Sequence, residues 1–181
     1  AILPMSLAVL VALRPVSGLS ELSELPEQSK PLRAALISSV LLFAVGGVIG
    51  IFISGSNVKI PAHYHGSIVG VTLALMGLVY HLLPRLGYVA PSGKLATLQP
   101  YLYGAGQLMH IAGLVWSGGY GVQRKVAGAD QVLRGVGEIA GMGLMGLGGL
   151  IAIVGGLLFV IVVLRAMLGS DLPQPRNTIS S

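Results

Sequence analysis

Two histidines separated by one residue, His63 and His65, stand at the head of a long apolar stretch. On an α-helix, residues i and i+2 are about 200° apart in rotation, so the two imidazoles leave opposite flanks of the helix. Ligands for one metal ion instead favour spacings of three or four residues, which share a face. The spacing therefore predicts that each imidazole serves a separate group, such as two flat cofactors with one helix between them.

A histidine inside a membrane span is costly and usually functional, although some histidines only form hydrogen bonds across a helix bundle. Neutral imidazole is a common axial ligand of haem iron, and its second ring nitrogen needs a partner that fixes the ring. Gly66 and Gly70 follow the pair and are expected to leave room for a macrocycle near the backbone. We therefore interpret His63 and His65 as haem ligands, with structural hydrogen bonding as the alternative.

A basic pair, Arg124 and Lys125, follows the third long apolar stretch. Haem propionates are anionic, and the fork of an arginine bonds both oxygens of a carboxylate. We expect the pair to bind propionates, because it is predicted to lie on the same side of the membrane as the histidines. The alternative is a helix end stabilised by cations, or lysine and arginine side chains that extend to the interface.

Other polar residues have less specific interpretations. Gln107 and His110 share one face of the third apolar stretch, where they shape a proton or water path or bond a neighbouring helix. His81 is expected to have a structural role at the membrane interface. The run 141–146 spells GxGxxG without a preceding strand, so it does not predict nucleotide binding. Small residues recur at about every fourth position and predict close helix packing; they are Gly137, Gly141, Gly148, Ala152 and Gly156.

The composition places the chain in a lipid bilayer. Hydrophobic residues make up 54% of it and charged residues 9%, whereas a soluble domain carries about 25% charged residues. The net charge of +5 lies in short loops beside apolar stretches, so it indicates membrane orientation and not nucleic-acid binding. The chain has no cysteine, which excludes disulfides, thiolate-bound iron–sulfur clusters and cysteine-based zinc sites.

We predict an all-α, polytopic membrane helix bundle. Four stretches are long enough to cross a bilayer about 30 Å thick, namely 33–54, 60–84, 101–120 and 139–168. Prolines and a glycine in 89–100 predict a turn-like connector there. The domain scheme is a partial transmembrane helix at 1–13, a polar connector at 14–32, a four-helix membrane domain carrying the haem ligands at 33–168, and a cytoplasmic tail at 169–181.

The lysines and arginines divide unevenly between the two predicted sides. Seven lie on one side, at Arg14, Lys30, Arg33, Arg85, Lys94, Arg165 and Arg176, and four on the other, at Lys59, Arg124, Lys125 and Arg134. Because cytoplasmic loops carry the excess of positive charge, the first side and the C-terminus are predicted to be cytoplasmic. His63, His65 and the basic pair then lie toward the outer side.

From Lys59 to Lys125 the chain resembles the C-terminal part of the catalytic subunit of haem–copper oxidases, the cytochrome oxidase subunit I family. The sequence from Pro61 to Gly66 is similar to the His-aromatic-His signature on that family's tenth helix. Tyr80 to Tyr88 resembles the end of the same helix, and Gly118 to Lys125 resembles the loop after helix eleven. By this resemblance the four long stretches are helices nine to twelve, and 1–13 is the end of helix eight.

The resemblance implies a role for each site residue. His63 would be the catalytic residue, as the proximal ligand of the high-spin haem at which oxygen is reduced. His65 would be one axial ligand of the low-spin haem that supplies the electrons. Arg124 and Lys125 would contact propionates, although lysine in place of the commoner second arginine keeps the charge and loses the fork. The loop 55–58 lacks the His-Asp pair with which many members bind a non-redox metal.

The resemblance also implies parts that this chain lacks. The family's copper ligands lie on helices six and seven, and the second ligand of the low-spin haem lies on helix two. We therefore expect a fragment or one half of a split catalytic subunit, inactive alone. Its expected partners are the remaining helices on another chain, a copper-containing or cytochrome c-binding subunit, and membrane lipid.

The function that follows is reduction of oxygen to water, coupled to proton movement, in the plasma membrane of a bacterium or archaeon. The haem type, whether a, b or o, and the electron donor, whether cytochrome c or quinol, stay open. One alternative is nitric oxide reduction by a member of the same superfamily, in which iron replaces the copper. Another is a non-catalytic structural membrane subunit without haem.

Overall fold

The computed structural model describes residues 26–123 and 135–169. Its elements are α3 (Ser29–Ile51), α4 (Lys59–Leu82), the short 3-10 helix η2 (Pro84–Leu86), α5 (Gly93–Gly119) and α6 (Val136–Leu168). The prediction of an all-α chain is confirmed for these residues, in which the only strand-like pairing is an isolated bridge between Asn57 and Gln123. The predicted partial helix at 1–13, Arg124, Lys125 and the tail from 170 onward lie outside the described residues.

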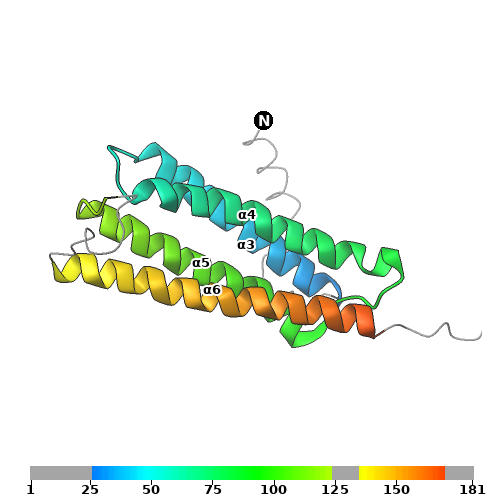
Figure 1. Ribbon diagram of the computed structural model, residues 1–181. Helices are drawn as coiled ribbons and strands as arrows, with labels where there is room; N and C mark the ends of the chain where they lie inside the picture. The colour runs from blue at the N-terminus through cyan, green and yellow to red at the C-terminus, as the bar shows by residue number, and fades with distance from the viewer. Residues whose placement is uncertain (1–25, 124–134, 170–181) are drawn as a thin grey trace, which may run out of the picture.

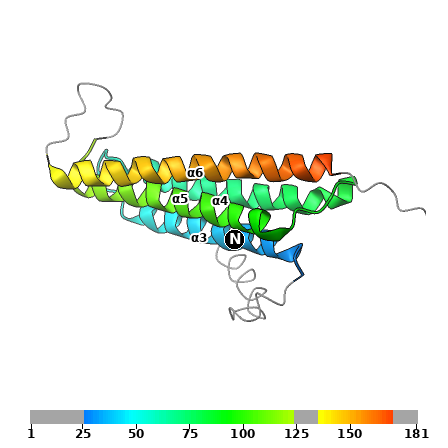
Figure 2. The ribbon, with the colours of Figure 1, turned by 90° about the horizontal axis from the view of Figure 1, so that it is seen from below.

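The four long helices lie side by side and alternate in direction (Figure 1). α3 packs chiefly against α4, and α5 chiefly against α6, while contacts of α5 with α3 and α4 join the two pairs (Figure 2). Sequential antiparallel neighbours are the arrangement that short connections favour. As a result, the start of α4 and the end of α5 meet at one end of the bundle.

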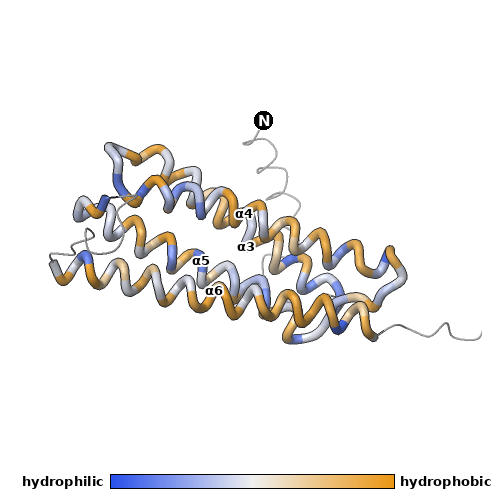
Figure 3. Tube along the Cα trace, in the orientation of Figure 1, coloured by the Kyte–Doolittle hydropathy of each residue, from blue (hydrophilic) through white to orange (hydrophobic). Residues whose placement is uncertain are grey.

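Three of the helices are long and apolar enough to cross a membrane, namely Ser29–Ile51, Lys59–Leu86 (α4 with η2) and Val136–Leu168. Hydrophobic residues run along their whole lengths (Figure 3). Many of these side chains are exposed, among them Ile153, Leu157 and Leu164 of α6. Long apolar helices with outward-facing hydrophobic side chains indicate an integral membrane protein. α5 is less apolar, because it carries Gln99, Gln107 and His110.

Glycines allow the helices of each pair to approach closely. A Cβ atom at Gly46 of α3 would overlap the backbone of Gly66 and Ser67 on α4. Between α5 and α6, the predicted face of small residues is confirmed at Gly141, Gly148 and Ala152, which are buried. At its far end Gly155 is buried in place of the predicted Gly156. Helices associate in lipid largely through close backbone packing, because burial of apolar surface provides no driving force there.

The turn-like connector predicted at 89–100 is wrong from Gly93 onward, because α5 begins there and contains Pro100. Proline removes one backbone hydrogen bond from a helix. Here the segment is held by tertiary contacts, since Ala96, Gln99 and Pro100 are all buried. The first two turns of α5 are therefore set by packing against neighbouring helices, which local composition does not reveal.

Gln99 connects three helices through its buried side chain. The hydroxyl of Tyr80 on α4 donates a hydrogen bond to Gln99 Oε1 at 3.0 Å. Gln99 Nε2 donates to the carbonyl oxygen of Gly155 on α6 at 3.1 Å. A buried amide that satisfies both its donor and its acceptor specifies how α4, α5 and α6 are aligned.

Candidate haem site

His63 and His65 lie near the start of α4 and face different neighbours. His63 Nδ1 is 2.7 Å from the carbonyl oxygen of Gly46 on α3. The ring of His65 lies against the ring of His110 on α5, with 4.7 Å between their centroids. Tyr64, between the two histidines, is exposed. The i, i+2 spacing thus sends the two imidazoles to opposite flanks of α4, as its geometry predicts.

The partner of His63 fixes which of its nitrogens carries the proton. A backbone carbonyl only accepts hydrogen bonds, so Nδ1 must be the protonated nitrogen and the donor to Gly46. In a neutral ring the lone pair is then on Nε2, the atom that a metal would take. A carbonyl bonded to the far nitrogen of a histidine is a common second partner of metal-binding imidazoles. Nε2 of His63 is thus the ring nitrogen left for a further partner.

His65 has the same arrangement within its own helix. Its Nδ1 lies 2.9 Å from the carbonyl oxygen of Pro61, one turn earlier. His110 repeats the pattern across helices, because its Nδ1 lies 3.0 Å from the carbonyl oxygen of Met145 on α6. Both rings therefore have Nδ1 as donor and Nε2 as the free lone pair. For His110 this bond is the contact with a neighbouring helix that we gave as one of its two interpretations.

The space beside His63 depends on a glycine that the sequence did not single out. A Cβ atom at Gly50 of α3 would lie 2.8 Å from His63 Nδ1 and 2.9 Å from its Cε1. Gly66 and Gly70 were predicted to leave room for a macrocycle near the backbone. This prediction is wrong, because α3 fills the space that their missing side chains leave. A Cβ atom at Gly70 would lie 2.8 Å from the backbone nitrogen of Phe43. These two glycines admit a helix and not a macrocycle.

The loop that leads to the basic pair is tied to the start of α4. The backbone nitrogen of Val58 donates to the carbonyl oxygen of Val122 at 3.1 Å. Asn57 and Gln123 form the antiparallel bridge next to it. Gln123 is the residue before Arg124, so the chain enters the basic pair beside the histidine end of α4. Arg124 and Lys125 themselves lie outside the described residues.

The side chains suit a cofactor that brings most of its own ligands. Among residues 26–123 and 135–169, no group of three or more histidine, aspartate or glutamate side chains is placed to hold a metal ion. A bare transition metal needs such a group. A haem iron already has four porphyrin nitrogens and needs only an axial imidazole. Single imidazoles with a fixed Nδ1 and a free Nε2 therefore fit haem.

Sequence reasoning missed the contact between His65 and His110. The polar positions of α5 were visible as a face with Gln107, but their periodicity does not say which residue of which helix they meet. The role of Gly50 beside His63 could not be recognised either, because nothing in the sequence distinguishes it among the 27 glycines of the chain. Both contacts depend on how the helices are aligned.

Comparisons with known proteins give relatives of undescribed function. The chain is 40% identical to an uncharacterized protein of Rickettsia prowazekii over 147 residues, which cover 75% of this chain and 28% of that protein. It is 33% identical to an uncharacterized protein of Aquifex aeolicus over 69 residues, which cover 38% of this chain and 18% of that protein. The chain thus spans less than a third of either relative. No protein-family model and no solved structure matches it.

Proposed function

We propose that the chain is the haem-binding half of the catalytic subunit of a respiratory terminal oxidase of the haem–copper type. The observation that supports this most is the pair of imidazoles on opposite flanks of α4, each with Nδ1 bonded to a carbonyl oxygen. A helix with such a pair is able to hold two haems, one on each flank. The resemblance of residues 59–125 to that family points to the same use.

In this proposal His63 binds the high-spin haem and His65 the low-spin haem. Bound haem iron would supply the redox chemistry by which oxygen is reduced to water. The protein's contribution is to aim each Nε2 and to fix each tautomer through the Gly46 and Pro61 carbonyls. Because one short backbone segment carries both ligands, the two haems would be held close together, which favours fast electron transfer.

Arg124 and Lys125 would bind the propionates on the outer side of the membrane. The hydrogen bond between Val58 and Val122 supports this, since it holds the chain before the pair next to α4. α5 would be the fourth transmembrane helix despite its polar residues, because several of these are buried or bonded to neighbouring helices. The C-terminus would be cytoplasmic, and the membrane would be a bacterial or archaeal plasma membrane.

Copper and the second ligand of the low-spin haem would come from helices outside this chain. The relatives are much longer than the matched region, which is compatible with a longer or split catalytic subunit. The chain would therefore act only together with those helices and with a copper-containing or cytochrome c-binding subunit. Proton movement coupled to oxygen reduction would be a property of the whole complex.

The test uses the complex that co-purifies with this chain from membranes. His63→Ala should abolish oxygen reduction and leave a low-spin haem spectrum, whereas His65→Ala should remove the low-spin signal and leave high-spin haem. His81→Ala is the matched control, because His81 is an exposed histidine at the other end of α4. If a pyridine-haem assay finds no haem in the unmodified complex, the chain is a structural subunit and the proposal fails.

A further inference from the structure

Two clefts flank the connector between η2 and α5 (residues 87–92), at the end of the bundle opposite the histidine pair. The backbone nitrogen of Val89 donates to the carbonyl oxygen of Ala166 at 3.2 Å, which holds this connector against α6. The first cleft has a volume of about 180 Å³ and is lined by Ser92, Leu95 and Arg165 among others. The second has a volume of about 230 Å³ and is lined by His81 and Arg85. Ala90 and Pro91 belong to both clefts.

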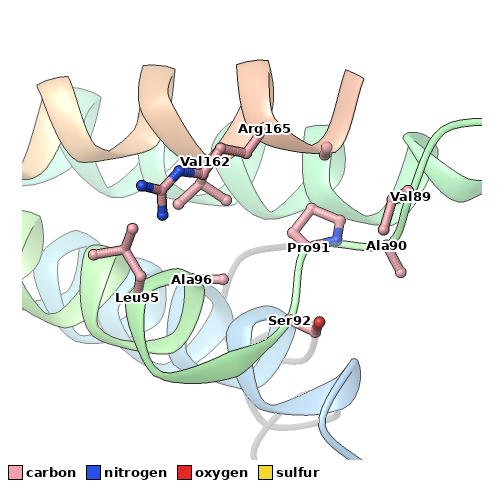
Figure 4. A pocket seen from close by; sticks show the side chains of 9 residues that line it. Val89, Ala90, Pro91, Ser92, Leu95, Ala96, Val162 and Arg165 are labelled. Carbon is pink, nitrogen blue, oxygen red and sulfur yellow. The ribbon is translucent and has the colours of Figure 1, made fainter. Parts of the chain in front are cut away.

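Each cleft contains one arginine whose charge is uncompensated in the described part of the chain. Figure 4 shows the guanidinium group of Arg165 extending from α6 toward the first turn of α5, near Leu95 and Ala96. The side chains of Arg85 and Arg165 have no hydrogen bond or ion pair with any described residue. Lys30, at the same end, already pairs with Glu27. These clefts therefore favour an anionic ligand with oxygen acceptors that match the guanidinium fork.

The surface next to the clefts is apolar. Large hydrophobic side chains are exposed on α6 at Ile161, Leu164 and Leu168, and on α4 at Leu78 and Leu82. The clefts lie where the long apolar helices end, the depth at which phospholipid headgroups meet the hydrocarbon core. A cationic cleft followed by an apolar helix surface matches a ligand with a negative head and hydrocarbon chains.

We infer that one anionic phospholipid binds across these two clefts. Arg85 and Arg165 are the residues that bind its phosphate group. The acyl chains lie along the exposed hydrophobic side chains of α4 and α6. The site is independent of haem, since it lies at the other end of the helices. By the charge count of the sequence it faces the cytoplasmic leaflet.

The experiment measures lipid binding to the detergent-purified complex by native mass spectrometry. Phosphatidylglycerol, zwitterionic phosphatidylcholine and inorganic phosphate are titrated separately. Arg85→Gln and Arg165→Gln should each weaken phosphatidylglycerol binding by more than about tenfold, as expected when a charged hydrogen-bonding group is lost. Lys94→Gln is the matched control, because Lys94 is exposed at the same end and lines neither cleft. It should weaken binding by less than about fivefold, the effect of diffuse attraction.

Three results would overturn the inference. One is a loss of phosphatidylglycerol affinity in Lys94→Gln as large as that in Arg165→Gln. This would show that the lipid is attracted only by the general positive charge of the surface. The second is equal binding of phosphatidylcholine. The third is displacement of the lipid by inorganic phosphate at the same concentration, which would identify a free-anion site. Arg85→Lys and Arg165→Lys keep the charge without the fork, so they should bind with intermediate affinity and guard against misfolding of the glutamine variants.

Discussion

His63 donates a hydrogen bond to the carbonyl oxygen of Gly46, a residue at which a Cβ atom would overlap the α4 backbone. The residue that accepts this bond is also the residue whose missing side chain lets the two backbones meet. The direction of the imidazole is therefore set by helix packing, and not by a separate polar network. Any change that pushes α3 away from α4 must also turn His63.

Gly46→Ala should disrupt both features at once. Its Cβ atom would overlap the backbone of Gly66 and Ser67, which cannot move as a flexible side chain does. Overpacking of this kind costs about 1–3 kcal/mol. We expect a lower midpoint of thermal unfolding in detergent, together with less high-spin haem in the purified complex. Gly47→Ala is the control, because a Cβ atom there has nothing within 4 Å; an equal loss in that variant would contradict the packing argument.

Gly50→Ala should act on His63 with less effect on stability. The new Cβ atom would meet the ring of His63 at 2.8 Å, so the ring must tilt or withdraw. The off-rotamer adjustment costs about 0.5–1.5 kcal/mol. We expect an altered spectrum of carbon monoxide bound to the high-spin haem and an unchanged low-spin spectrum. A change confined to the low-spin signal would show that the two histidines are assigned to the wrong haems.

The sequence predicts elements well and contacts poorly. Apolar length is a local property, so the long helices and the small-residue face around Gly148 were predictable. The start of α5 was not, because Gln99 is held by Tyr80 and Gly155, which are far away along the chain. The i, i+2 spacing predicted by helix geometry alone that the two imidazoles lie on opposite flanks of α4. No sequence pattern indicates which residue of a neighbouring helix each imidazole contacts.

Gln99→Leu should weaken the alignment of α4, α5 and α6. It leaves the Tyr80 hydroxyl buried without its acceptor and removes the donor to Gly155. Hydrogen bonds between membrane helices contribute about 0.6 kcal/mol on average and up to about 1.7. We expect Gln99→Leu to lose more stability than Tyr80→Phe, and the double variant to lose less than the sum. The measurement is a double-mutant cycle of unfolding free energies for the protein in detergent. Strictly additive stability losses would contradict the network.

Gly121→Ala should disturb the loop before the basic pair. Gly121 has φ +83°, a left-handed conformation that costs other residues about 1–2 kcal/mol. Strain there should loosen the hydrogen bond between Val58 and Val122, which holds the segment before the basic pair against the start of α4. We expect faster loss of haem to a protein that scavenges it. Gly119→Ala is the control, since that glycine has open space and lies within α5; equal haem loss in both variants would argue against a role for this loop.

His110→Phe tests whether the His110 ring, which lies tilted against the ring of His65, affects the low-spin haem through that ligand. Phenylalanine keeps a ring at this position but loses the hydrogen bond to Met145, so the ring is free to rotate against His65. Because the plane of an axial imidazole affects the electronic structure of its haem, we expect a shifted electron paramagnetic resonance signal and a shifted reduction potential of the low-spin haem. His110→Asn retains a donor for the Met145 carbonyl but removes the ring that contacts His65, so it should also shift both values. A merely structural role for His110 would lower stability in the two variants and leave the signal of the remaining folded complex unchanged.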